Sequence, residues 1–161
     1  MKTLQAIQIE LGIAQHKHTK ALLTWRMNAL LGQLFDNADR EKILEVSGTM
    51  VVTVCQFCSS NSIKVPYGQS RPKKLDTSYD NLSGIVVFLG QTNCELSIWE
   101  SKIISGVLED EDLELHRDRL FLFLGHILFY LDKLVRETSK HDNLLTVVNQ
   151  LVAKPNPQRG A

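Results

Sequence analysis

The sequence predicts an all-α protein that folds as one helical bundle. Apolar residues recur at helical spacing along most of the 161 residues, and glycine and proline, which interrupt helices, are scarce outside one segment. Hydrophobic residues make up 43% of the chain, enough for one well-filled core but too few residues for two ordinary domains. We therefore expect a single domain over residues 1–154 and a flexible tail at 155–161.

The first part of the chain predicts three helices. Helical spacing of apolar residues covers 4–14 and 22–34, and an acidic turn at 36–39 then offers a cap for a helix from about 39 to 60. Within that third stretch "VVTV" has the composition of a strand. No hairpin turn bounds it, so we expect buried helix there as well.

A linker separates these helices from a second group. Residues 63–80 hold two of the four prolines, together with Gly68, two serines and four basic side chains. Helical patterns resume in "YDNLSGIVVFLG" and "CELSIWESKIISGVL", continue in a long helix from about 112 to 138, and end with "HDNLLTVVNQLVAK".

Composition restricts the partners and the compartment. The apolar run 120–131 is a dozen residues long, whereas a membrane-spanning helix needs about 20, so we expect a buried helix and a cytoplasmic protein. Eighteen basic residues balance eighteen acidic ones, so no overall field attracts nucleic acid or an anionic membrane. Three cysteines cannot all pair, and Cys55 and Cys58 lie in an apolar pattern that predicts buried free thiols.

The two groups of helices resemble one another. Seven residues separate tryptophan from the next glycine in both, at Trp25 and again at Trp99. Eight residues separate Arg40 from Gly48, and likewise Arg117 from Gly125. We interpret residues 1–62 and 81–154 as two half-repeats joined by the linker 63–80, each burying the apolar face of the other.

A glycine followed by a polar residue interrupts the apolar helix of each half. The pairs are Gly48-Thr49 and Gly125-His126. Glycine lets a neighbouring element approach closely, and the next residue can point a polar group into the gap. His126 is then either a core histidine bonded to nearby carbonyl groups or a donor to a ligand in a cleft.

The segment "EDEDLELHRDRLFLFLGHILFYLDKLVRETSKHDNLLTVVNQLVAK" resembles the all-α nucleoside triphosphate pyrophosphohydrolases of the MazG type. In the first half "DREKILEVSGTMVVTVCQF" is similar to the same helix, and "WRMNALLGQLF" to the helix before it. The resemblance lies in the apolar pattern and the placement of glycine. It implies a helical fold, homo-oligomers, and a site where E-x-x-E and E-x-x-D pairs hold magnesium against a triphosphate.

The carboxylates of that family are mostly missing here. The E-x-x-D positions correspond to Val46 and Thr49 in the first half and to Phe123 and His126 in the second. The E-x-x-E positions correspond to Arg26 and Ala29, then to Glu100 and Ile103. One carboxylate cannot build a magnesium site, so we expect neither catalytic residues nor a cofactor.

The resemblance therefore implies binding of a nucleotide, or of a nucleotide-derived signal, without turnover, as in a protein that sequesters its ligand. The expected ligand-binding residues include three groups: cations that neutralise phosphate, hydrogen-bond donors, and residues on or beside the former metal face. They are Arg26, Lys102, Lys73 and Lys74; Thr49 and His126; and Asn28 and Glu100.

Two alternatives stay open. An active, magnesium-dependent pyrophosphohydrolase would need a rebuilt site that uses Glu45, Glu100 and the acids at 109–114. A helical module that binds another protein would instead show a large exposed apolar patch and no charged cleft. Trp25 and Trp99 could stack on bases, although matching tryptophans in a repeat are more often part of the core.

Overall fold

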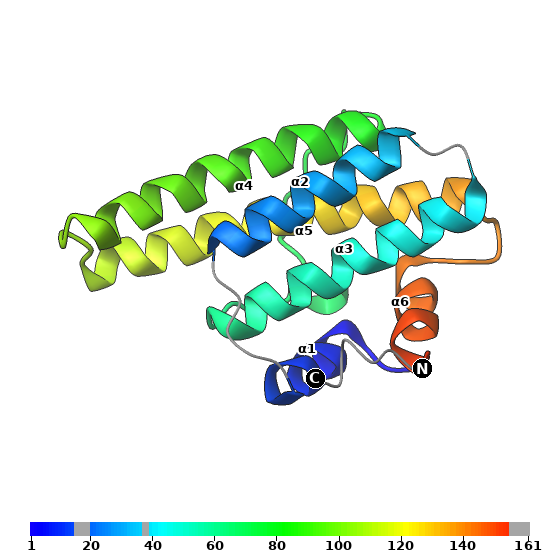
Figure 1. Cartoon of the computed structure of the whole chain (residues 1–161), viewed down its shortest axis with the longest axis horizontal. Coiled ribbons are helices and arrows are strands. Elements are labelled where there is room, and N and C mark those ends of the chain that lie inside the picture. The colour runs from blue at the N-terminus through cyan, green and yellow to red at the C-terminus, as the bar shows by residue number, and fades with distance from the viewer. Residues whose placement is uncertain (15–19, 37–38, 155–161) are drawn as a thin grey trace.

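The computed structural model describes residues 1–14, 20–36 and 39–154, and these residues form an all-α bundle without strands (Figure 1). The expected fold class is confirmed. The described residues form the following helices: α1 (Leu4–Ala14), α2 (Lys20–Asp36), α3 (Arg40–Ser60), α4 (Asn81–Ile104), α5 (Asp110–Thr138) and α6 (Leu144–Ala153), with a short 3₁₀ turn at Gly68–Ser70. The predicted tail lies outside the described residues.

Two helical hairpins make up the centre of the molecule. Helices α4 and α5 run antiparallel along almost their whole length, and α2 and α3 form the second hairpin (Figure 1). Helix α3 contacts α5, and α2 contacts α4, so the two hairpins pack against each other. Helices α1 and α6 pack against α3. The two helical patterns of the sequence at 79–90 and 94–108 form a single helix, α4, which ends at Ile104; Gly106 then turns the chain with a φ of 69°.

Side chains cap the N-terminal ends of α3, α4 and α5, and the first of these caps lies in the acidic turn predicted at 36–39. Asp39 accepts a hydrogen bond from the backbone N–H of Glu41, and Asp80 accepts one from Ser83. Helix α5 begins with a capping box in which Glu109 and Asp112 bond each other's backbone N–H groups. These caps satisfy backbone donors that the first helical turn leaves unpaired.

Helix α3 is the most deeply buried element. Val51, Val52 and Val54 are all buried, so the valine-rich stretch is core helix, as predicted. By length and composition α3 could also cross a membrane, with a mean hydropathy of 1.3 over its most apolar window. Within the bundle, however, 67% of that window is buried, and its packing accounts for its apolar sequence.

The glycines of the two core helices make room for neighbouring elements. A Cβ on Gly48 would lie 3.1 Å from Val147 of α6, and one on Gly125 would lie 2.6 Å from the ring of Pro72. The close approach that the glycines predicted is therefore present in both helices. The element that approaches is different, because α6 covers one glycine and residues 63–80 cover the other.

Residues 63–80, which we call the strap, are bound to the bundle along their length. Gln8 of α1 bonds the backbone of Ile63 and Val65, at 2.8 and 3.0 Å. The hydroxyl of Tyr130 in α5 donates to the carbonyl of Asp76 at 2.5 Å and accepts from the backbone N–H of Tyr79 at 3.2 Å. The segment does join the two predicted halves, but it is not the solvated tether that its composition suggested.

Each core helix also bonds the end of the other. Arg40, the first residue of α3, donates to Ser139 just beyond α5, at 2.8 Å. Arg117 near the start of α5 donates to the carbonyl of Asn61, just beyond α3, at 3.1 Å. These reciprocal contacts support the duplication inferred from the spacing, which stays a prediction.

Candidate functional site

The most unusual surface of the molecule is the outer side of helix α4. None of its exposed side chains is charged, although exposed helical positions normally carry many charges. These exposed residues are Ser83, Val86, Gly90, Gln91, Cys94, Ser97, Ile98, Ser101, Ile103 and Ile104. Helix α5 shows the usual pattern instead, since most of its exposed residues are acidic or basic.

Helix α2 continues this surface. Over residues 23–36 its exposed residues include one charged side chain, Asp36, at its last position. Two large aromatic side chains are exposed on it, with Trp25 at 70% and Phe35 at 58% exposure. We call the part of this surface that lies along the groove between the two helices the α2–α4 face. It consists of Thr24, Trp25, Asn28, Gly32 and Phe35 on α2, and Val86, Gly90, Asn93, Ser97, Glu100 and Ile104 on α4.

The spacing of the α4 residues shows why they share one face. They follow one another at intervals of four and three residues, which keeps side chains on the same side of a helix. The opposite side of α4 carries the core residues, such as Ile85 and Leu89. Helix α4 thus has two stripes, and α2 covers the second one only in part: Asn93 and Glu100 are partly buried, whereas the other four residues of the stripe are exposed.

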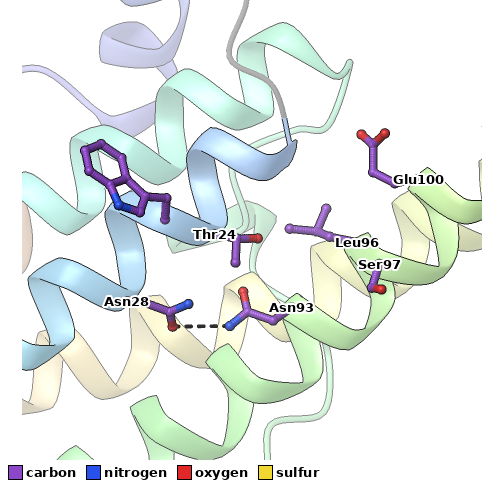
Figure 2. Close-up of a pocket in the computed structure, with 7 residues that line it drawn as sticks. Thr24, Asn28, Asn93, Leu96, Ser97 and Glu100 are labelled. Atoms are coloured by element: carbon purple, nitrogen blue, oxygen red, sulfur yellow. Dashed lines mark hydrogen bonds between the residues drawn. The ribbon is translucent and has the colours of Figure 1, made fainter.

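A shallow groove of about 450 Å³ runs between the two helices at the middle of this face (Figure 2). Its lining consists of Thr24, Trp25, Asn28, Asn93, Leu96, Ser97 and Glu100. The amide of Asn93 donates to the side-chain oxygen of Asn28 at 3.2 Å and joins the two helices across the groove. The groove therefore offers apolar surface, hydroxyl groups and amides, with one carboxylate and no basic side chain.

The structure separates the residues that the sequence predicted as one site. Asn28 and Glu100 do lie together at the groove. Arg26 is two residues from Asn28, which at about 100° per residue places it on another side of α2. Lys102 is likewise two residues from Glu100 on α4, and its amine pairs with Asp112 of α5 at 3.0 Å.

Thr49 and His126 each have partners within the protein. The Thr49 hydroxyl donates to the carbonyl of Glu45, one turn earlier in the helix, at 2.9 Å. The Nε2 atom of His126 accepts from the backbone N–H of Asp76 at 2.8 Å, and its Nδ1 lies 2.9 Å from the carbonyl of Leu122. The ring also stacks on Phe88, with centroids 3.8 Å apart. His126 is 4% exposed and holds the strap on α5, so its geometry matches the core interpretation.

The strap lysines lie apart from the groove. Lys73 and Lys74 are exposed on the segment that follows Pro72, which packs on Gly125 of α5. The strap contacts described above are to α1 and α5, whereas the groove lies between α2 and α4. The cations expected to neutralise one phosphate are thus distributed over three different places.

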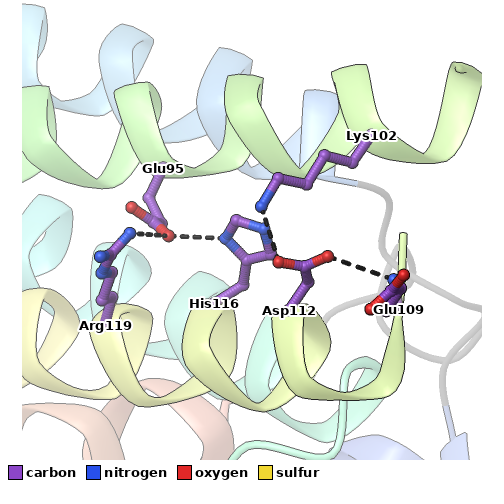
Figure 3. Close-up of polar contacts among 6 residues, drawn as sticks. All are labelled: Glu95, Lys102, Glu109, Asp112, His116 and Arg119. Atoms are coloured by element: carbon purple, nitrogen blue, oxygen red, sulfur yellow. Dashed lines mark hydrogen bonds and ion pairs between the residues drawn. The ribbon is translucent and has the colours of Figure 1, made fainter. Parts of the chain in front are cut away.

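A buried polar cluster between α4 and α5 was not predicted (Figure 3). The Nδ1 atom of His116 lies 2.6 Å from a carboxylate oxygen of Glu95, and Arg119 approaches the same oxygen at 3.5 Å. His116 is fully buried and stacks on Trp99, while its Nε2 atom has no partner among the described residues. Glu95 and His116 are 21 residues apart, so only the register of the hairpin brings them together.

This cluster ties the two helices together and is closed to substrates. Glu95 is 5% exposed and His116 is not exposed, so no small molecule reaches the pair. Towards the helix ends Lys102 bonds Asp112 and, with the backbone N–H of Glu109, lowers the pKa of that carboxyl group (Figure 3). Lys102 therefore serves the hairpin rather than the groove.

The thiols behave as the sequence predicted. Cys55 and Cys58 are buried and unpaired, and burial raises the pKa of Cys55 to about 12. The pKa of Cys58 is also raised, first by burial and then by its neighbour Cys55. Such thiols stay protonated and unreactive at neutral pH. Cys94 is exposed on α4.

The residues that the structure describes include no group of three or more His, Cys, Asp or Glu side chains placed to hold a metal ion. The acids at 109–114 instead cap α5 and pair with Lys102 and Arg117. Comparisons of this chain with protein-family models, curated proteins and solved structures find no match.

Proposed function

We propose that this chain is a non-catalytic helical interaction module that binds another protein surface through its α2–α4 face. One observation carries the proposal: this face exposes Trp25, Phe35, Val86 and Ile104 but presents no cation, one carboxylate at its groove, Glu100, and one at its edge, Asp36. Protein interfaces are depleted in charge and enriched in aromatic side chains at their centres. Exposed apolar patches rimmed by polar residues mark interaction sites on soluble proteins.

The test is site-specific photo-crosslinking in cells that express the chain. A photoreactive phenylalanine analogue replaces Ser97 on the face or, as the matched control, Gln91 on the same helix. Gln91 is exposed and lies six residues away, about 120° around α4, outside the face. We expect a discrete protein adduct from position 97 and none from position 91. Equal yields at both positions, or no adduct at either, would contradict the proposal.

Binding of a nucleotide without turnover is the second candidate. It is favoured by the groove itself, where an exposed indole lies beside two amides that could bond the edge of a base. The arrangement would hold the base of a nucleotide or nucleotide-derived signal, with water around its phosphates. This candidate does not require Arg26, Lys102 or the strap lysines to converge.

A depletion and release assay tests this candidate. The protein is incubated with a nucleotide panel, with and without magnesium, then filtered and heat-denatured, and the returned nucleotides are quantified. Return of an intact nucleotide, accompanied by quenching of Trp25 but not of the buried Trp99, would establish sequestration. Magnesium-dependent conversion to a monophosphate would instead favour the pyrophosphohydrolase alternative.

A further inference from the structure

We infer that the partner of the α2–α4 face is a second copy of this chain, docked face to face around a twofold axis. The inference rests on the proposed interaction function and names its partner. It begins from what the face lacks: a surface without cations offers no attraction to anionic lipid headgroups or to nucleic acid. It likewise offers little to a strongly basic partner, because it carries one carboxylate at the groove, Glu100, and one at its edge, Asp36.

A neutral face is complementary to itself. In a twofold interface each residue meets the same patch on the other copy, so a charged patch would face its own charge. The exposed charges of α5 are mostly acidic, five against two basic, so this surface would be repelled by its own copy in such an arrangement. The α2–α4 face instead places apolar and small polar side chains opposite apolar and small polar side chains.

The face is also large enough. Helix α2 has 17 residues and α4 has 24, so at about 1.5 Å per residue they share a length of roughly 25 Å. Two adjacent helices are about 20 Å wide together, which gives roughly 500 Å² on each copy. The total of about 1,000 Å² reaches the lower limit for a specific interface.

Two glycines on the face leave space for close packing. A Cβ built on Gly32 or on Gly90 would meet no atom within 4 Å, and neither residue has a positive φ. Nothing among the residues that the structure describes therefore explains their lack of a side chain. A second copy would explain it, because the backbone of its helices could approach these two glycines closely.

Gly90 allows a variant that blocks docking without harming the fold. Gly90→Lys adds a long cation at the centre of the face, in a helical position that has open space and favours lysine over glycine. Gln91→Lys is the matched control, because it adds the same charge one residue along but about 100° around the helix. Trp25→Ala removes the largest exposed side chain of the face, which is of the type that dominates interface energies.

Sedimentation velocity from about 1 to 100 µM provides the measurement, with a circular-dichroism melt of each variant to verify folding. We expect the wild-type chain and Gln91→Lys to be dimeric at the upper concentrations. Gly90→Lys and Trp25→Ala should each raise the dissociation constant at least about tenfold.

A folded wild-type chain that remains monomeric at about 100 µM would overturn the inference, as would a fully dimeric Gly90→Lys variant. The photo-crosslink separates this failure from failure of the proposed function. A monomeric chain whose position 97 forms an adduct with a different protein disproves self-association and supports the interaction function. A monomeric chain that forms no adduct disproves both.

Discussion

Position within a helix, rather than residue type, decides what each glycine does. Gly84 and Gly90 are both in α4, but a Cβ on Gly84 would lie 2.5 Å from the ring of Tyr130, whereas one on Gly90 would meet nothing. Gly84 lets an aromatic ring pack against the helix backbone. Gly90 has no such neighbour among the described residues, so within a single chain it only weakens the helix.

These two glycines give a paired prediction. Gly90→Ala should raise the free energy of unfolding by about 0.5–1 kcal/mol, because alanine restricts the unfolded chain and favours the helix. Gly84→Ala should lower it by about 1–3 kcal/mol, because the buried Tyr130 must move. Urea denaturation at submicromolar protein measures both. Destabilisation by Gly90→Ala would mean that its surroundings are more crowded than the structure shows.

A second prediction at the residue scale concerns Cys55. Burial raises its pKa to about 12 in the folded state, while an exposed thiol in the unfolded chain titrates near 9. The folded state thus favours the neutral thiol, and this stability is present below pH 9 and lost as the pH rises towards 12. Each such thiol should contribute a slope of about 1.4 kcal/mol per pH unit in that window.

Denaturation curves at intervals from pH 8 to 11 measure this slope. Cys55→Val should reduce it, because valine has no proton to lose. Substitution of the exposed Cys94 by serine is the control and should leave the slope unchanged. An equal slope in the wild-type chain and in Cys55→Val would show that the alkaline transition has another origin.

At the scale of elements, the sequence was sufficient wherever helices follow from local periodicity. The third helix was expected from about residue 39 to 60 and extends from Arg40 to Ser60; the long helix was expected from about 112 and begins at Asp110. Apolar spacing and an acidic cap are local features, and both are readable without knowledge of the fold.

The contacts that define the strap are not local. Its composition, rich in proline and basic residues, is also that of a mobile linker. What holds it are bonds to Gln8, His126 and Tyr130, which lie 50 to 57 residues away. The Glu95–His116 pair was missed for the same reason. The two tryptophans of the repeat also differ in exposure, because neighbouring helices cover Trp99 but not Trp25. Such pairings depend on how the hairpins assemble.

The strap gives a prediction of its own. Gly125→Ala would place a methyl group 2.6 Å from the rigid ring of Pro72, so the strap should be displaced and stability lowered by about 1–3 kcal/mol. Trypsin cleaves after lysine, and Lys73 and Lys74 follow Pro72 directly. We therefore expect cleavage at these lysines to be markedly faster in Gly125→Ala than in the wild-type chain.

Gly32→Ala provides the control for that experiment, because a Cβ there meets no atom within 4 Å. It should leave the cleavage rate at the strap unchanged. Identical rates in all three proteins would show that Pro72 does not depend on Gly125 for its position. The strap would then be held mainly by its bonds to Gln8 and Tyr130.

For the whole molecule, the arrangement of charge and apolar surface is uneven. Charged side chains dominate the exposed surface of α5 and occur on the strap, while the α2–α4 face is almost free of them. The overall balance of eighteen basic and eighteen acidic residues conceals this segregation. This segregation also explains why the overall charge predicted no partner, because the surface that we propose for binding is distinguished by its lack of charged side chains.

Self-association through this face predicts that thermal stability depends on protein concentration. When unfolding is coupled to dissociation of a dimer, each tenfold increase in concentration favours the folded dimer by about 1.4 kcal/mol. The Tm of the wild-type chain should therefore rise steadily from about 1 to 100 µM in calorimetric scans. In Gly90→Lys the Tm should not change with concentration. At the lowest concentration it should equal or exceed that of the wild-type chain, because lysine favours the helix more than glycine does. A concentration-dependent Tm of the same slope in Gly90→Lys would show that the chains associate through another surface.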